Sequence, residues 1–132
     1  GGYPATLTLD RHPVWGDRLD DSDDAVLMVS MVARPHGLDA GAFIDRYRAH
    51  AEMARTHHGF DAYRQNLVIG GTAVHGTGPA AVSEILLADE KAWRDRFYTG
   101  DGSFEAVGRD VARFLDRAAT RSTLVRRFPG SA

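Results

Sequence analysis

The chain has 132 residues, the size of one ordinary domain and too short for two separate cores. Hydrophobic residues make up 43% of it and charged residues 26%, which is typical of a globular protein and excludes a disordered one. The formal net charge of -2 argues against nucleic acid as a partner, because nucleic-acid binders carry a basic excess. The absence of cysteine excludes disulfides, thiolate zinc sites and cysteine nucleophiles.

No apolar run in the sequence reaches the length that a membrane-spanning helix needs. No secretory signal is visible either. We therefore expect a cytoplasmic protein that has no membrane partner.

The first 24 residues predict an N-terminal extension or arm ahead of the main domain. Residues 6–9 alternate threonine and leucine and could form a short strand. Residues 17–24 contain five aspartates and little that is apolar, a pattern that predicts an exposed linker. We place the domain at residues 25–128 and treat residues 129–132 as a C-terminal tail.

Residues 25–33, with the sequence AVLMVSMVA, form the clearest predicted strand, because the run is short and rich in β-branched residues. A strand that is apolar on both faces must have both faces buried against other parts of the protein. Both faces are apolar here, with Val26, Met28 and Val32 on one and Leu27, Val29 and Met31 on the other.

A helix is predicted over residues 39–58. Asp39 suits the N-cap, and Gly59 suits the stop that follows. Charged side chains occupy one side of this helix. On the other side, mainly apolar and aromatic residues recur at i, i+4 and i+7 spacing. They are Phe43, Tyr47, His50, Ala51, Ala54 and His57.

Two further strands are predicted at residues 62–69 and 82–88, joined by a glycine-rich loop over residues 70–79. Asp89 is expected to cap a short helix that carries Trp93 and Phe97. Ser103 opens another helix, and residues 122–128 form the last strand. The apolar side of the helix after Ser103 is expected to carry Phe104, Val107, Val111, Phe114 and Leu115.

The resulting order is β-α-β-β-α-β, with the second helical region in two pieces. This order predicts an α+β, ferredoxin-like fold: a four-stranded antiparallel sheet with helices on one face. Helices cover only one face, whereas residues 25–33 are apolar on both. If the second face were left uncovered, it would expose a large apolar patch to water. We therefore expect a homodimer in which two sheets face each other.

Over roughly residues 26–128 the chain resembles the EthD-like proteins of the dimeric α/β barrel superfamily. The histidine within a helix is a recurrent feature of that family. The resemblance is carried by an ordered set of segments: PHGLD at 35–39, FIDRYRAHA at 43–51, HGF at 58–60, Tyr63, Glu84, RFY at 96–98 and DVARFLD at 110–116.

The resemblance implies a homodimeric barrel with a ligand pocket between each sheet and its helices. Relatives in the superfamily include aromatic polyketide cyclases, cofactor-free quinone-forming monooxygenases, lactone isomerases and polyketide-acid decarboxylases. The fold by itself does not select one of these reactions.

His50 is the first candidate for chemistry, because it lies on the apolar side of its helix one turn from Tyr47. A buried histidine bonded to the backbone is the competing interpretation. Tyr63 and Glu84 lie on adjacent predicted strands. Tyr63 could stabilise an enolate, and Glu84 could orient His50 or act as a base. Their structural alternatives are a half-buried aromatic residue and a partner for an arginine.

The expected ligand-binding residues are mostly aromatic, because cavities for aromatic ligands are lined in this way. His50 and His57 are about 10 Å apart along a helix axis, too far for one metal ion. We therefore expect no metal and no cofactor. The residues expected to line the pocket are Phe43, Tyr47, Ala54, His57, Trp93 and Phe97.

The leading hypothesis is a cofactor-independent enzyme acting on an aromatic or polyketide-like small molecule. Proton transfer by His50, assisted by Tyr63 and Glu84, would drive cyclisation, dehydration, decarboxylation or isomerisation. A cofactor-free monooxygenase is the alternative reaction, and consumption of oxygen separates the two. A non-catalytic binder of a hydrophobic metabolite and a purely structural dimer also stay open.

Overall fold

The computed structural model describes residues 6–16, 24–72 and 78–126. The start of the expected arm, most of the linker predicted at 17–24, the middle of the glycine-rich loop and the tail lie outside the described residues. Within the described ranges, no helix combines the length and the apolar character that a membrane crossing requires.

The described residues form six strands and three helices. The strands pair antiparallel in one sheet of order β1-β4-β5-β3-β6, and β2 also pairs with β4. The elements are β1 (Thr6–Asp10), β2 (Pro13–Trp15), β3 (Val26–Val32), α1 (Ala40–His57), β4 (Ala62–Thr72), β5 (Ala81–Leu87), α2 (Glu90–Arg96), α3 (Ser103–Val111) and β6 (Arg121–Arg126).

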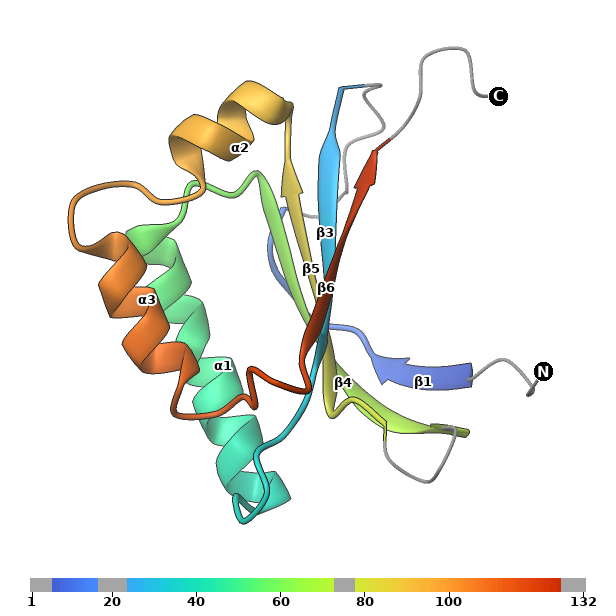
Figure 1. The fold of residues 1–132 in the computed structure, drawn as a ribbon. Coiled ribbons are helices and arrows are strands. Elements are labelled where there is room, and N and C mark those ends of the chain that lie inside the picture. The colour runs from blue at the N-terminus through green and yellow to red at the C-terminus, as the bar shows by residue number, and fades with distance from the viewer. Residues whose placement is uncertain (1–5, 17–23, 73–77, 127–132) are drawn as a thin grey trace.

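The four strands β4, β5, β3 and β6 form the centre of the fold, with β3 and β5 inside. Together with α1 and the α2–α3 pair they give the chain order β-α-β-β-α-β of a ferredoxin-like fold. All three helices lie on one side of the sheet (Figure 1). The predicted α+β class, the antiparallel sheet and the one-sided helices are therefore confirmed.

The prediction of a four-stranded sheet is wrong, because residues 6–10 and 13–15 add β1 and β2 to the edge of β4. An edge strand leaves backbone N–H and C=O groups unpaired, and the N-terminal residues supply partners for them. β4 also continues to residue 72 instead of ending at 69, because β1 pairs along its second half. In Figure 1 this half of β4 and β1 project away from the helices.

β2 is held against the core by Trp15. Its indole Nε1 donates a hydrogen bond of 2.9 Å to the carbonyl of Phe60. The same ring packs edge-on against Tyr63 at a centroid distance of 5.2 Å, and the Arg55 guanidinium lies 5.1 Å from its ring centroid. The N-terminal residues therefore support Tyr63 on β4 and Phe60 just before that strand.

The helix boundaries follow the predicted caps. Asp39 accepts a hydrogen bond of 2.8 Å from the backbone N–H of Ala42, and Asp89 accepts one of 2.7 Å from that of Ala92. α1 ends at His57, and a Cβ on Gly59 would lie 2.9 Å from the carbonyl oxygen of Arg96. Glycine is therefore required there by the close approach of the α2 end.

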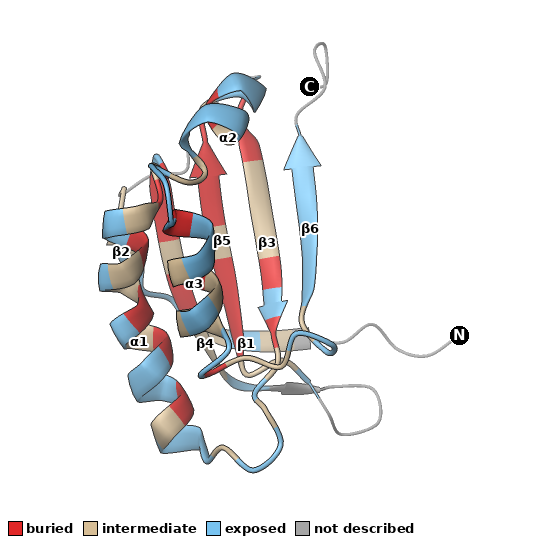
Figure 2. Ribbon diagram, turned by 60° about the vertical axis from the view of Figure 1, so that its left-hand side comes forward, coloured by how far each residue is buried: buried red, intermediate tan, exposed pale blue. Residues whose placement is uncertain are grey.

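Burial is uneven across the sheet (Figure 2). β5 is buried almost throughout, whereas every residue of β6 is exposed. On the face away from the helices, Met31 is 40% exposed and Val125 is 48% exposed. The expectation that Phe104 packs in the core with the rest of its helix is wrong, because its ring is 66% exposed.

Candidate ligand pocket

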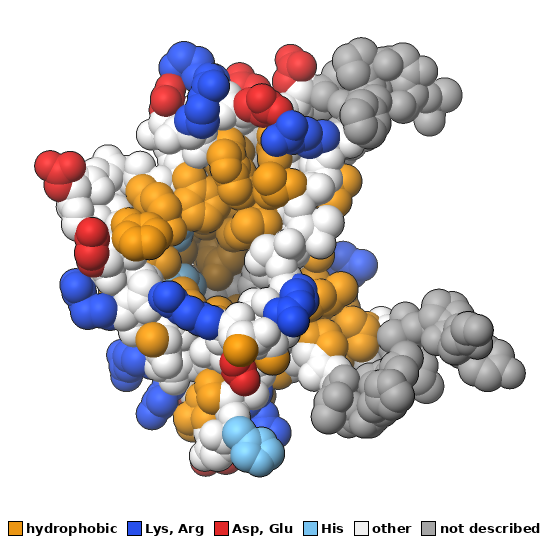
Figure 3. Space-filling view, in the orientation of Figure 1, with side chains coloured by type: hydrophobic (Ala, Val, Ile, Leu, Met, Phe, Trp, Pro, Cys, Tyr) orange, Lys and Arg blue, Asp and Glu red, His pale blue; other side chains and the backbone are white. Residues whose placement is uncertain are grey.

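A cavity of about 170 Å³ lies between the helix-facing side of the sheet, the helices α1 and α3, and the segment that follows α2. In Figure 3 it opens as a hollow with hydrophobic walls and histidine at its depth. Its apolar lining residues are Met28, Val32, Phe60, Ile85, Phe97, Val107, Val111, Phe114 and Leu115. Its polar lining residues are Ser30, Tyr47, His50, His58, Tyr63, Ser83, Tyr98, Thr120 and Ser122.

His50 projects from α1 into this cavity and is 7% exposed. Its Nδ1 lies 2.5 Å from Oδ2 of Asp110, a residue of α3. A carboxylate only accepts hydrogen bonds, so in the neutral imidazole Nδ1 carries the hydrogen and Nε2 keeps its lone pair. Arg113 lies 3.7 Å from the other oxygen of Asp110, and the ring of Phe114 packs against the imidazole at 5.2 Å. The contact with Asp110 thus fixes the tautomer of His50, and the His50 ring packs in an aromatic part of the cavity wall.

Two tyrosines face the same cavity from α1 and β4. The hydroxyls of Tyr47 and Ser83 are 2.7 Å apart, and Gln65 Nε2 donates a bond of 3.1 Å to the hydroxyl of Tyr63. Burial raises the pKa of Tyr47 well above its usual value and raises the pKa of Tyr63 to about 12. Both phenols therefore stay protonated near neutral pH and can act as hydrogen-bond donors.

Hydroxyl groups from β3 and the last part of the chain form a polar strip on the sheet side of the cavity. The side chains of Ser30 and Ser122 are hydrogen-bonded at 2.8 Å, and Thr120 accepts a bond of 3.0 Å from the backbone of Ala33. Antiparallel pairing of β3 with β6 places Ser30 opposite Ser122. This strip gives an otherwise apolar wall groups that can orient a ligand.

His58 is a second histidine in the cavity and is 7% exposed. Its Nδ1 donates to the carbonyl of Phe97, and its ring stacks on Phe60 at a centroid distance of 4.2 Å. Desolvation lowers the pKa of His58 to about 4, although the hydrogen bond to the carbonyl opposes this shift. The imidazole is therefore neutral near pH 7.

Of the nine site residues predicted from the sequence, four line the cavity: His50, Tyr63, Tyr47 and Phe97. The remaining ligand-binding candidates are not among its described lining residues. Phe43 stacks behind Tyr47, Trp93 packs behind Phe97, Ala54 is fully buried in the core, and His57 bonds through Nδ1 to the hydroxyl of Ser103 at 2.9 Å.

Glu84 does not join His50, because side chains alternate along a strand and its neighbours Ser83 and Ile85 face the cavity. On the opposite face, Glu84 accepts a hydrogen bond of 2.7 Å from Asn66 and lies 3.9 Å from Arg11. The expected role of Glu84 in orienting His50 therefore falls to Asp110.

Asp110 and His58 are functional candidates that the sequence reasoning missed. A signal for Asp110 existed, because it follows Val107 by three residues and precedes Phe114 by four. A carboxylate on the apolar side of a helix needs a partner. His58 carried no such signal, because it comes after the last helical residue, where periodicity no longer indicates direction.

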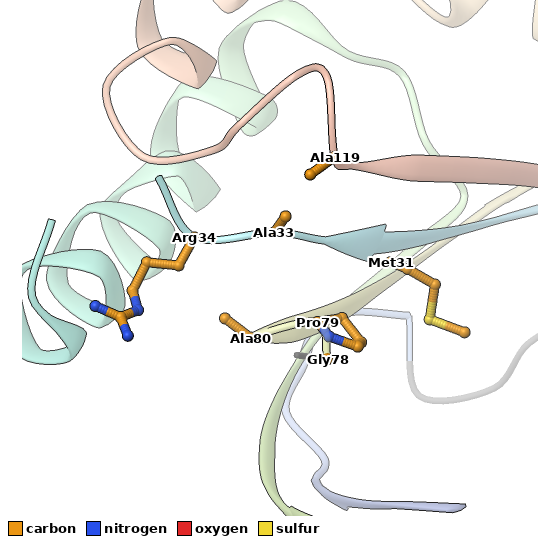
Figure 4. A pocket seen from close by; sticks show the side chains of 7 residues that line it. All are labelled: Met31, Ala33, Arg34, Gly78, Pro79, Ala80 and Ala119. Carbon is orange, nitrogen blue, oxygen red and sulfur yellow. The ribbon is translucent and has the colours of Figure 1, made fainter. Parts of the chain in front are cut away.

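A second hollow lies at the end of β3 and is open to solvent, with a volume of about 610 Å³. Figure 4 shows its lining, which is mostly small or aliphatic side chains. Arg34 is its one charged described residue, and its guanidinium donates to the carbonyl of Leu38. None of the described residues that line this hollow is a histidine, a carboxylate or a tyrosine, so the cavity that holds His50 is the candidate site. In addition, no three metal-ligating side chains come together within the described ranges.

No protein-family model matches the chain. No curated protein matches it either. Among solved structures, the chain is similar to SnoaB, described as a cofactor-independent oxygenase from Streptomyces nogalater. The TM-score is 0.50 at 14% sequence identity, and the match covers 82% of this chain and 99% of SnoaB. At this identity the similarity shows a shared fold, in agreement with the ferredoxin-like order of the four central strands.

Proposed function

We propose that this protein is a small cofactor-independent enzyme that removes a proton from an acidic hydroxyl or carbon of an aromatic or polyketide-like molecule. The observation that carries the proposal is the contact of 2.5 Å between His50 and Asp110 beside a largely apolar cavity. Such a reaction needs a base, a group that orients the base, and a cavity that holds the reacting atom.

His50 is the base in this proposal. Its Nδ1 donates to Asp110, so Nε2 presents a lone pair to a molecule in the cavity. When Nε2 takes the proton, the imidazole becomes a cation and the carboxylate beside it stabilises that charge. Asp110 thus serves as a positioning residue that fixes the tautomer and supports the charged state.

The anion formed from the substrate is stabilised by the buried hydroxyl donors. Tyr63 and Tyr47 both line the cavity, and both phenols are protonated near neutral pH, since burial moves each pKa still further above it. A donor that stays neutral can accommodate developing negative charge on an oxygen atom. Cyclisation, dehydration or isomerisation can each proceed from such an anion.

A cofactor-free oxygenation is the second candidate, and the similarity to SnoaB favours it. It begins with the same deprotonation at His50. A ring methylene then becomes a carbonyl as one atom of O2 enters the product. The other oxygen atom leaves as water with both methylene hydrogens, and the substrate supplies all four electrons.

We also propose that the chain is EthD-like and forms a homodimer in which two sheets face each other as a barrel. The helix-facing side of the sheet is occupied by the cavity and the core. The opposite side leaves Met31 and Val125 exposed on neighbouring strands. Apolar side chains on two adjacent strands are well suited to packing against a second sheet.

The test uses a panel of hydroxylated aromatic molecules that includes hydroquinone, 1-naphthol and anthrone. Each is incubated with the protein with and without air, product is identified by mass spectrometry, and oxygen uptake is recorded. Turnover that needs oxygen supports the oxygenase, and turnover without it supports the other reactions.

The variants His50→Ala and Asp110→Asn test the assignment on whichever molecule reacts. Loss of the base is expected to lower kcat about 100-fold or more. Asp110→Asn is expected to lower kcat because the amide can hold the wrong tautomer. Full turnover by His50→Ala would exclude this mechanism. Tight binding of a panel member without any product would instead favour a non-catalytic binder.

A further inference from the structure

We propose that His58 is a specificity-determining residue of the cavity: its Nε2 accepts a hydrogen bond from a hydroxyl of a neutral aromatic ring, and the cavity excludes aromatic carboxylates. This inference deepens the proposed function and rests on it for the assumption that the cavity binds the substrate. It concerns which molecules enter the cavity and not the chemical step itself.

The His58 ring is held in one orientation by its neighbours. Nδ1 is used by the carbonyl of Phe97, which only accepts, so Nδ1 must carry the hydrogen. Nε2 is then an acceptor, and it makes no hydrogen bond within the described residues. Stacking on Phe60 and edge contact with Phe97 at 4.9 Å hold the ring plane. Nε2 is thus a hydrogen-bond acceptor of fixed direction in an apolar wall, and a ligand that fills the cavity must offer it a donor.

The charge of the lining residues also bears on which ligands can enter. Among the described residues that line the cavity, none is lysine, arginine, aspartate or glutamate. His58 does not supply a cation, because its pKa is lowered to about 4 by burial and it stays neutral near pH 7. An aromatic carboxylate would therefore enter without an ion-pair partner at this end of the cavity. A phenolic hydroxyl is neutral and donates the hydrogen that Nε2 can accept.

The size of the cavity limits how much of a ligand it can hold. The volume of about 170 Å³ is below the roughly 300 Å³ at which sites for drug-sized ligands begin. A volume of this size holds about one aromatic ring. The mouth is apolar, since Phe104 is 66% exposed and its ring contacts Tyr98 at 5.6 Å, while Leu124 is 43% exposed beside Met28. A ligand with further rings can extend across this mouth while one hydroxylated ring occupies the interior.

The experiment measures binding of four small probes to the full chain at pH 7 by NMR titration. Resorcinol and phenol carry hydroxyl donors, toluene has the shape of phenol without a donor, and benzoate carries a charge. Wild-type protein is expected to bind resorcinol and phenol more tightly than toluene and to bind benzoate most weakly. The 15N signal of His58 Nε2 is expected to shift when resorcinol is added.

The variants His58→Phe and His58→Asn both lack an acceptor at the position of Nε2. Phenylalanine keeps a ring for stacking on Phe60, and asparagine keeps a donor for the carbonyl of Phe97. Both are expected to weaken resorcinol binding about threefold to tenfold and to leave toluene binding unchanged. The control is His36→Asn, in the exposed turn after β3, which should match the wild type.

The inference is overturned if benzoate binds as tightly as resorcinol, if no hydroxylated probe saturates, or if folded His58 variants bind resorcinol like the wild type. Should both variants fail to fold, the probe ranking and the Nε2 shift of the wild type decide the question. Because these are binding measurements, a protein that selects resorcinol but catalyses nothing would refute the proton-transfer proposal and leave the role of His58 intact.

Discussion

His50 and His58 show how two residues of one type differ within a single cavity. Both donate from Nδ1, but the acceptor is the Asp110 carboxylate for His50 and the Phe97 carbonyl for His58. A carboxylate stabilises an imidazolium by charge, whereas a carbonyl among aromatic rings offers only a partial dipole. The first residue is therefore suited to gaining a proton and the second to remaining an acceptor.

The lowered pKa of His58 makes the stability of the protein depend on pH. The folded-state pKa is about 4, below the unfolded value of 6.5, so the unfolded chain binds the extra proton between these two values. Stability is therefore present above pH 6.5 and falls by about 3 kcal/mol as the pH drops to 4.

Urea unfolding between pH 7 and pH 4.5 measures this dependence. His58→Phe removes the titrating group and is expected to flatten the slope, whereas His36→Asn should leave it in place. An identical slope in the wild type and in His58→Phe would show that other groups cause the acid sensitivity.

At the scale of the element, the helices and the central strands were predictable from the sequence. Periodicity identified α1, and the caps at Asp39 and Asp89 fixed two helix starts. Sequence periodicity cannot show which residues from distant elements meet. The contact between His50 and Asp110 spans 60 residues, and only the packing of α1 against α3 creates it.

The edge of the sheet was the least predictable element. Pairing of β1 and β2 with β4 depends on the length and curvature of β4, which local pattern does not encode. Glu84 was misplaced for a related reason. Its strand is buried on both faces, so the alternation that indicates direction was hidden in a run of apolar neighbours.

Gly16, which directly follows β2, provides a test of how tightly the N-terminal strands are held. Its φ is +77°, and an added Cβ would lie 2.7 Å from Cβ of Ala62. Gly16→Ala is expected to destabilise the fold by about 2–5 kcal/mol, the sum of left-handed strain and overpacking. Thermal or urea unfolding measures the change.

Gly37 is the matched control, because its φ is +91° but an added Cβ would meet nothing within 4 Å. Gly37→Ala should cost only the backbone strain, about 1–2 kcal/mol. Equal losses in the two variants would contradict the close packing of residue 16 over β4.

At the scale of the whole molecule, the uncovered face of the sheet predicts association. Val125→Glu and Met31→Glu place a charge on that face and are expected to convert a dimer into a monomer, because burying an unpaired carboxylate is costly. Light scattering after gel filtration gives the mass directly.

Ile44→Glu is the control for this experiment. Ile44 is 38% exposed, close to the value for Met31, but it lies on α1 on the other side of the molecule. The Ile44 variant should keep the mass of the wild type. A wild-type protein that is monomeric at micromolar concentration would contradict the facing-sheet arrangement.

The bond between Ser30 and Ser122 joins residues that are 92 positions apart. During synthesis on the ribosome, β3, α1, β5 and α3 all emerge before β6. A nascent chain can therefore bring His50 and Asp110 together while the side of the cavity next to β3 is still open. Non-local pairing of this kind slows folding, and the part of the cavity wall that contains Ser122 can form only after β6 has emerged. Until then, the cavity would be exposed to water and to chaperones.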